Sequence, residues 1–345
     1  MMLIRPVEPG DLDALVELSR VADAGRSMLQ SNIEQLFVLI QRSCQSFAGE
    51  LELADRRYVF ALEDGQTGKL AGISGIEAAL GLREPWYNYR VGTIVHASKE
   101  LGIYSRHATL FLSNDHTGYS ELTSLFLHPD YLSADSNNLL SKARFLFIAQ
   151  YPELFGPVVT AEMRGYLDAD GRSPFWEALG RHFFGLDFAY ADSLTNAGEK
   201  AFVAELMPKY PVYTDFLPPE AQSVIARTHE NSRAARAQFE SEGLRFEGYV
   251  DIFDAGPTVQ AHVQEIRAVR ESREVKVKFV DSLPSGAVCD KWLVANHLRE
   301  QFRAILIEAP LPDSGELLLL PEQAARLQVN EGNQVRIVAC QPRWP

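Results

Sequence analysis

The sequence contains few cysteines for its length of 345 residues. Its three cysteines, Cys44, Cys289 and Cys340, lie far apart and form no CxxC pair. This pattern fits neither a disulfide framework nor a structural zinc site. A nucleophilic cysteine is disfavoured as well, because a catalytic thiol needs an electropositive setting that the sequence does not show. We expect three reduced thiols in the core or at the surface.

Long apolar runs and an excess of basic residues are also missing. No apolar segment reaches the roughly 18 to 20 residues that a membrane-spanning helix needs. The N-terminus turns acidic at once, without the pattern of a signal peptide. The formal net charge is −13, whereas nucleic acids and anionic membranes require a basic face on their partner. We therefore expect a cytoplasmic protein with no nucleic-acid partner and no membrane partner.

Several common catalytic signatures are absent. The sequence has no GxSxG, P-loop or GxGxxG motif. None of the eight histidines stands in a ligand spacing such as HxxxH with a carboxylate. We expect no metal site and no permanently bound cofactor.

Patterns of strand and helix do alternate along the first eighty residues. Apolar residues predict a strand at 3–6, and helical spacing after Asp11, which stands in the position of an N-cap, predicts a helix. A second helix is predicted over 33–47. Two β-rich runs within 58–80 flank the turn sequence 64–68 and indicate an antiparallel hairpin.

The middle of the chain continues this alternation. The patterns predict a hairpin with loops over 83–120, strands over 120–129 and 158–163, helices over 136–151 and 173–188, and an Ala-rich helix followed by a strand within 232–257. Ser173 and Pro174 would give the helix over 173–188 its N-cap and its first-turn proline.

Beyond Asp254 the pattern changes to short β runs, which include 263–272, 273–280 and 302–309. We predict a boundary near residue 255, between a domain of residues 1–254 and a small, mostly β subdomain of residues 255–345. The expected fold class is α/β (α+β), with a mixed, mostly antiparallel sheet flanked by helices. The opening order of strand, helix and hairpin resembles the GNAT-like fold of acyl-CoA N-acyltransferases.

In enzymes of that fold, the CoA pyrophosphate binds where a strand opens onto a helix, here between Leu127 and Asn137. The first N–H groups of a helix are unpaired and carry the positive end of its dipole. We therefore predict that Ser136, Asn137 and Asn138 bind the CoA of the acyl donor. The loop contains no glycine, and Asp135 stands where an anion would bind. The alternative is an ordinary helix start that is capped by Asp135 or Ser136.

Two histidines are candidates for proton transfer, because imidazole ordinarily titrates near neutral pH. His229 follows an apolar helical run and precedes Glu230, so it is expected in a loop at a helix end. The alternative is a capping or surface histidine. His116 stands beside Asp115 in a sequence that is also typical of a tight turn, and it is the second candidate.

Cationic side chains are candidates for binding carboxylates or phosphates. Arg90 and Arg164 are the main ones, because a guanidinium group pairs with such anions in a bidentate manner. Lys99 and Lys142 are further possibilities. The alternative for each is an ordinary solvated charge.

A series of unusual segments carries a more specific signal. In chain order they are WYNYRVGTIVHASKELG, TLFLSNDHTG, ELTSLFLHPD, LLSKARF, AEMRG, SPFWEALG, AELMPKYPVY and YVDIFDAGP. In order and spacing they resemble the arginine N-succinyltransferase family, from about residue 1 to 270 and more thinly to the C-terminus.

The resemblance implies transfer of a succinyl group from succinyl-CoA, as co-substrate, to the α-amine of L-arginine. This reaction is the first step of a bacterial route of arginine catabolism to glutamate and succinate. His229 matches the family's proton donor, and Leu125 matches a succinyl-CoA-binding leucine. We expect the backbone N–H groups near Leu125, Phe126 and Leu127 to hold the oxyanion. The two substrate-carboxylate partners are then expected to be Arg90 and Arg164, with His116 as a further substrate contact.

Two departures from the family pattern suggest a paired enzyme. The Gly-rich pyrophosphate loop is replaced around 133–138, and the turn after the first helix reads ADAGRSMLQSN. Both features resemble the divergent α subunit that some bacteria pair with a paralogue. A paralogous subunit or a homo-oligomer is therefore expected. The alternatives are a weakly catalytic structural or regulatory subunit, and an N-acyltransferase that uses another donor or another amine such as ornithine.

Overall fold

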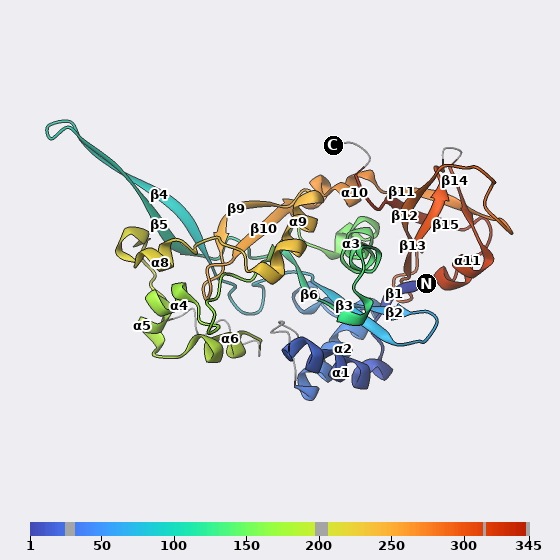
Figure 1. The fold of residues 1–345 in the computed structure, drawn as a ribbon, viewed down its shortest axis with the longest axis horizontal. Coiled ribbons are helices and arrows are strands. Elements are labelled where there is room, and N and C mark those ends of the chain that lie inside the picture. The colour runs from blue at the N-terminus through green and yellow to red at the C-terminus, as the bar shows by residue number, and fades with distance from the viewer. Residues whose placement is uncertain (25–31, 197–205, 313–314, 343–345) are drawn as a thin grey trace. The chain divides into compact units, whose positions relative to one another are not determined.

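The computed structural model describes residues 1–24, 32–196, 206–312 and 315–342 (Figure 1). The chain divides into two compact units. Unit 1 comprises Met1–Ala79, Leu122–Pro157 and His262–Pro345, and unit 2 comprises Leu80–Glu121 and Val158–Ala261. The ADAGRSMLQSN turn lies mostly outside the described residues.

Unit 1 is built on a mixed, mostly antiparallel sheet in the order β14-β11-β15-β12-β13-β1-β2-β3-β6. Its strands are β1 (Met2–Pro6), β2 (Arg57–Asp64), β3 (Leu70–Glu77), β6 (Ser120–Leu127), β11 (Arg273–Phe279), β12 (Cys289–Ala295), β13 (Ala304–Pro310), β14 (Glu316–Leu319) and β15 (Gln334–Ala339). The hairpin expected over 58–80 is β2 and β3, which pair antiparallel from Arg57↔Glu77 to Glu63↔Leu70. β13 pairs with β1, so the C-terminal strands continue the sheet of unit 1.

Helices cover this sheet. They are α1 (Leu12–Ala24), α2 (Ile33–Ala48), α3 (Ala134–Gln150), α10 (Arg267–Glu271) and α11 (Pro321–Leu327), with 3-10 turns η1 (Pro9–Asp11), η2 (Leu53–Asp55), η3 (Pro129–Tyr131), η4 (Pro152–Leu154) and η7 (Val263–Glu265). Successive residues of a strand point to opposite faces. Val59 and Ala61 of β2 pack in one core cluster with α1 and α2, whereas the rings of Tyr58 and Phe60 contact Phe147 of α3 at centroid distances of 5.1 and 5.3 Å.

Unit 2 carries a second row of strands in the order β7-β10-β9-β4-β5-β8. They are β4 (Asn88–Ser98), β5 (Ile103–Ser113), β7 (Val158–Glu162), β8 (Val212–Tyr213), β9 (Arg245–Val250) and β10 (Pro257–His262). The first two residues of β6 pair in parallel with β7. The helical elements are α4 (Pro174–Ala178), α5 (Gly180–Phe184), α6 (Phe188–Asn196), α8 (Pro219–Gln222) and α9 (Arg233–Ser241), with turns η5 (Thr214–Phe216) and η6 (Glu230–Ser232).

The expected fold class is confirmed, with two local corrections. The hairpin predicted within 83–120 is confirmed as β4–β5, which pairs from Asn88↔Ser113 to Ser98↔Ile103 and which Figure 1 shows as an extended ribbon. Segment 263–272 forms η7 and α10 where a strand was predicted. The helix over 173–188 begins at its predicted cap, Ser173, but breaks at Leu179. A Cβ on Gly180 would overlap the ring of Trp176, so tight packing accompanies the break.

The boundary near residue 255 stays a prediction. Across the described ranges, no helix is both long enough and apolar enough to span a bilayer.

Candidate active site

The strand β6 departs from regular geometry at Ser124. The φ angle of Ser124 is 53°, in the left-handed region that non-glycine residues rarely adopt. Such a residue interrupts the alternation of a strand and takes the neighbouring peptide groups out of the regular ladder. Leu125, Phe126 and Leu127 follow directly and are half-buried. The segment predicted to bind the acyl thioester therefore begins at a local distortion of the backbone.

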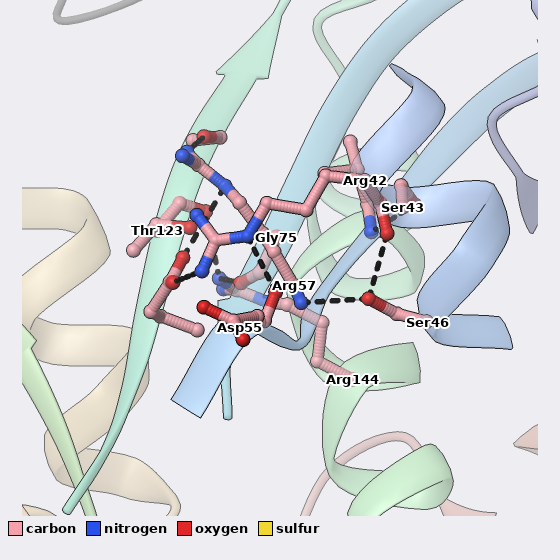
Figure 2. Close-up of polar contacts among 11 residues, drawn as sticks. Arg42, Ser43, Ser46, Asp55, Arg57, Gly75, Thr123 and Arg144 are labelled. Carbon is pink, nitrogen blue, oxygen red and sulfur yellow. Dashed lines mark hydrogen bonds and ion pairs between the residues drawn. The ribbon is translucent and has the colours of Figure 1, made fainter. Parts of the chain in front are cut away.

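A buried arginine supports this distortion from α3 (Figure 2). The Nη1 group of Arg144 donates to the carbonyl of Gly75 in β3 at 3.2 Å and to the carbonyl of Thr123 in β6 at 3.3 Å. Its side chain is fully buried, and this burial lowers the pKa of Arg144 to about 9. Arg144 thus ties the two strands together one residue before Ser124.

A second arginine holds the side chain of Ser124. The Nη2 group of Arg57 donates to Ser124 Oγ at 3.0 Å, and its Nε lies 3.5 Å from a carboxylate oxygen of Glu77. Arg42 of α2 pairs with the same carboxylate and donates to the carbonyl of Asp55 at 2.5 Å. Figure 2 shows Arg42, Arg57 and Arg144 converging on this end of the strands.

The helix α3 begins at Ala134, two residues before the expected start. Its N-cap is Ser133, whose Oγ accepts the N–H of Ser136 at 3.0 Å. The alternative of an ordinary capped helix start named the wrong capping residue, because Ser133, not Asp135 or Ser136, is the last residue with extended backbone before the helix. Ser136 is buried, while Asn137 and Asn138 are half-buried.

The acidic residue at this helix start is neutralised within unit 1. The Nζ group of Lys291 in β12 donates to both carboxylate oxygens of Asp135, at 2.8 and 2.7 Å. This pairing raises the pKa of Lys291, chiefly through its hydrogen bond to Asp135. The other cation of this region, Lys142, is buried in α3 and donates to the carbonyl of Cys340 at 2.7 Å.

In unit 2, the backbone around His229 is fixed on both sides. Its N–H donates to the carbonyl of Arg164 at 2.7 Å, and the adjacent Thr228 forms an isolated antiparallel bridge with Gly165. The backbone N–H of Asn231 lies 3.2 Å from the Nδ1 atom of His229. An Nδ1 atom that accepts a hydrogen bond leaves the proton of a neutral imidazole on Nε2. The Nε2–H group is therefore the donor of this ring.

Arg164 lies beside this segment and is itself partnered. Its Nη2 is 3.1 Å from a carboxylate oxygen of Asp192 in α6. Its guanidinium carbon is 5.9 Å from the ring centroid of Phe188. The structure thus brings Arg164 and His229 together, as neighbours joined through the backbone.

A buried carboxylate underlies the Arg164–His229 contact. The two oxygens of Asp254 accept the N–H of Gly165 and the N–H of Gly256, each at 2.7 Å. Burial and the negative charge of Asp251 raise the pKa of Asp254 to about 7, against the opposing effects of the two N–H donors and Arg164. Asp254 therefore anchors the segment after β7 that holds the backbone of His229.

A second group of candidates surrounds Tyr249 of β9. The Tyr249 hydroxyl donates to Asp115 at 2.7 Å, and the guanidinium carbon of Arg90 lies 5.7 Å from the tyrosine ring centroid. His116 is buried, with its ring 4.6 Å from that of Tyr249 and 5.4 Å from that of Tyr119. Burial and the Asp115 contact raise the pKa of Tyr249 to about 12. Arg90 and His116 thus lie in one cluster, in which the Asp115 carboxylate accepts the Tyr249 hydroxyl and lies 3.8 Å from Arg90.

Sequence reasoning missed three residues that organise these groups, namely Arg144, Tyr249 and Asp254. Asp254 and Tyr249 stand in the segment YVDIFDAGP, which was singled out for its resemblance only. An acidic residue next to small residues, as in DAGP, is a signal for a carboxylate that accepts backbone N–H groups. Arg144 gives no such signal, because an arginine in a helix is usually solvated.

Comparisons with known proteins agree over nearly the whole chain. The family described as "Arginine N-succinyltransferase beta subunit" matches residues 2–268, and the family of its C-terminal domain matches residues 273–339. An "Arginine N-succinyltransferase" of Yersinia enterocolitica is 50% identical over 98% of both chains. One of Escherichia coli is 48% identical over 98% of this chain and 97% of the relative.

A solved structure is similar as well. The arginine/ornithine succinyltransferase subunit AI from Pseudomonas aeruginosa superposes with a TM-score of 0.88 at 35% identity, over 99% of both chains. Family model, sequence relatives and solved structure name the same activity, so the resemblance read from the sequence is confirmed. The chain belongs to the arginine N-succinyltransferase family.

Proposed function

We propose that this chain transfers a succinyl group from succinyl-CoA to the α-amine of L-arginine, the first step of arginine catabolism to glutamate and succinate. Family membership supports an acyltransferase that uses an acyl-CoA co-substrate. The observation that carries the mechanism is the contact of the Asn231 N–H with His229 Nδ1, because it leaves a proton on Nε2. The proposed reaction belongs in the cytoplasm, where CoA thioesters and free arginine are available.

The proposed chemistry is direct transfer within a ternary complex. The neutral α-amine attacks the thioester carbonyl carbon, a C–N bond forms, and the negative charge develops on the carbonyl oxygen. Backbone N–H groups near Leu125, Phe126 and Leu127 hold that oxygen, next to the left-handed residue Ser124. The buried bonds of Arg144 fix the strand before any substrate binds, so this donor geometry needs no reorganisation during the reaction.

His229 completes the proton balance. When the tetrahedral intermediate collapses, the C–S bond breaks and the electron pair leaves with sulfur. The ring of His229 takes the surplus proton from the former amine nitrogen, and the resulting imidazolium protonates the CoA thiolate through its Nε2–H group. The products are N-succinylarginine and CoA in its thiol form.

The free carboxylates of the two substrates need cationic partners. We assign this role to Arg90 and Arg164, with His116 supporting the Arg90 cluster. Arg90 is well exposed and lies 3.8 Å from Asp115, beyond hydrogen-bond distance, so its planar donors are available for a bidentate contact. Arg164 keeps donors in addition to the one used by Asp192.

The test is the variant His229→Ala, assayed with succinyl-CoA and arginine. A general acid–base group of this kind is worth about 10²- to 10⁴-fold in rate, so kcat should fall by that amount. His182→Ala, which removes an exposed histidine of α5 in the same unit, is the matched control and should retain full activity. Wild-type kcat in His229→Ala would overturn the assignment.

One observation favours a second candidate function, that of a structural or regulatory subunit. The start of α3 has no glycine, carries Asp135, and already uses the N–H of Ser136 for its own cap. Calorimetry with CoA on the isolated chain separates the two, because micromolar affinity contradicts a subunit that has lost CoA binding. Assays of the chain alone and mixed with a paralogous subunit, with arginine and with ornithine, define the partner and the acceptor.

A further inference from the structure

A hollow of about 300 Å³ lies in unit 2 beside the segment that carries His229. It is lined by Ala226, Arg227, Thr228, Arg233, Arg236, Ala237 and Glu240. Thr228 in its wall is the residue directly before His229 in the chain. Three of the lining side chains are arginines, although the protein as a whole has a net charge of −13.

The three arginines differ in how firmly they are engaged. Arg236 is fixed, since its Nε donates to Glu240 at 2.8 Å and its Nη1 donates to Thr228 Oγ1 at 2.9 Å. Arg233 has a loose exposed pairing with Glu230, at 3.5 Å. The charges of Arg233 and Arg236 are thus partly compensated.

Arg227 is held in a different way. Its guanidinium carbon lies 4.0 Å from the ring centroid of Tyr166, a stacking distance that orients the planar group. Among the residues that the structure describes, no carboxylate pairs with Arg227. Tyr166 follows Gly165, whose bridge to Thr228 fixes the same wall. The hollow therefore presents one oriented, uncompensated guanidinium group next to the segment of His229.

We propose that this hollow, with Arg227 as its main donor, binds a substrate carboxylate. The proposal rests on the proposed function, because both substrates of that reaction carry such a group: the free carboxylate of the succinyl moiety and the α-carboxylate of the amino acid. A carboxylate accepts two parallel N–H bonds from a guanidinium group, which gives direction as well as affinity. This site is additional to the assignments of Arg90 and Arg164.

The experiment compares wild type with Arg227→Ala on matched substrate pairs. Succinyl-CoA is compared with butyryl-CoA, which has the same chain length without the carboxylate, and L-arginine is compared with L-argininamide. Loss of one charge-assisted bond should lower kcat/KM about 10- to 100-fold for the charged member of one pair. The kcat/KM of the member without the carboxylate should change little.

The pair that loses its discrimination identifies the bound carboxylate, and either pair supports the proposal. An equal loss of kcat/KM for the members with and without the carboxylate, as expected if the hollow held a CoA phosphate, overturns the proposal. Unchanged kinetics for all four substrates overturn it as well. Arg227→Lys, which keeps the charge without the planar fork, should recover part of the loss.

Two controls separate folding and function from binding. Arg172→Ala removes an exposed arginine of the same unit, one that pairs with Asp168 and Asp170, and should leave all four substrates unchanged. Calorimetric titration with succinate and with arginine measures carboxylate binding without turnover. If wild type binds one of them and Arg227→Ala does not, the site stands even where the succinyl-transfer assay fails, whereas equal binding by both proteins refutes it.

Discussion

The buried carboxylate of Asp254 gives the sharpest test of how the fold holds His229. Both of its oxygens accept short backbone bonds, from Gly165 and Gly256, and the residue is only 5% exposed. A Cβ on either glycine would lie within 2.8 Å of the Asp254 side chain, so both positions need glycine. Asp254 therefore sets the position of the segment after β7 in which the Arg164 carbonyl accepts the N–H of His229.

The size of the effect follows from the bonds that are lost. Asp254→Ala leaves two buried N–H groups without acceptors, and each costs about 1 to 3 kcal/mol. We therefore expect a loss of about 2 to 6 kcal/mol in the free energy of unfolding, partly offset because a buried negative charge is removed. Asp254→Asn keeps one acceptor oxygen and should cost about half as much. In either variant a shift of His229 by about 1 Å would lower kcat by roughly 10²-fold.

The raised pKa of Asp254 also predicts the direction in which stability changes with pH. The pKa of Asp254 is raised from 3.8 to about 7 in the folded protein by burial and by Asp251, with Arg164 opposing. A proton bound more tightly in the folded state favours folding below pH 3.8, and this contribution is lost as the pH rises through about 7. The stability of Asp254→Asn relative to wild type should therefore improve between about pH 4.5 and about pH 8.

Urea unfolding at both pH values, together with kcat measurements, provides the assay. Asp187→Asn removes an exposed acid of the same unit, which lies 3.4 Å from Arg181, and is the matched control. It should leave both the unfolding free energy and kcat close to wild type. If Asp254→Ala changes the unfolding free energy by less than about 0.5 kcal/mol, as an ordinary surface substitution does, the anchoring role is refuted.

Three further predictions concern unit 1. Gly72→Ala places a Cβ 2.5 Å from the carbonyl oxygen of Phe126, so it should push β3 away from β6. The free energy of unfolding in urea should fall by about 1 to 3 kcal/mol, and CoA binding should weaken. An unchanged unfolding curve would contradict this close approach. Lys291→Ala leaves the charge of Asp135 unpaired and should raise the calorimetric Kd for CoA several-fold, whereas Asp135→Asn should lower that Kd. Changes of Kd in the opposite directions would mean that CoA does not bind at α3. Arg144→Met removes hydrogen bonds to three carbonyls, those of Ser141, Gly75 and Thr123, and also removes a buried charge. The unfolding free energy should therefore fall by about 1 to 3 kcal/mol, and a more stable variant would show that desolvation outweighs these bonds.

The sequence predicted those elements whose signal is local. The hairpin of β2 and β3 follows from two β-rich runs around a turn, and the cap at Ser173 follows from its Ser-Pro pair. The errors arose where distant contacts decide the local structure. Segment 263–272 has apolar residues near strand spacing, but Arg267 is buried in α10 with its Nη1 on the carbonyl of Ala339. No local pattern contains that partner.

In the candidate site, too, local features were visible in the sequence and distant contacts were not. His229 was found because a histidine after a helix is visible in the sequence, and its loop is η6, which it caps through Nδ1. The contact of His229 with Arg164 depends on the bridge between Gly165 and Thr228, a pairing between distant parts of the chain. Residue type therefore suggested the proposed chemistry, whereas the groups that orient His229 could be found only in the tertiary structure.

The start of α3 shows how a departure from the family pattern can be compatible with anion binding. A glycine-rich loop admits phosphate by offering bare backbone, and an acid in its place should repel the ligand. Here the acid is Asp135, and Lys291 neutralises it from β12 with contacts to both oxygens. The first-turn N–H groups then face a neutral ion pair, and the helix dipole still favours a phosphate. If CoA binds at the start of α3 as proposed, the C-terminal strands contribute to that site, since Lys291 of β12 supplies the counter-charge. On this argument, removal of the C-terminal strands would weaken CoA binding through electrostatics as well as through lost packing.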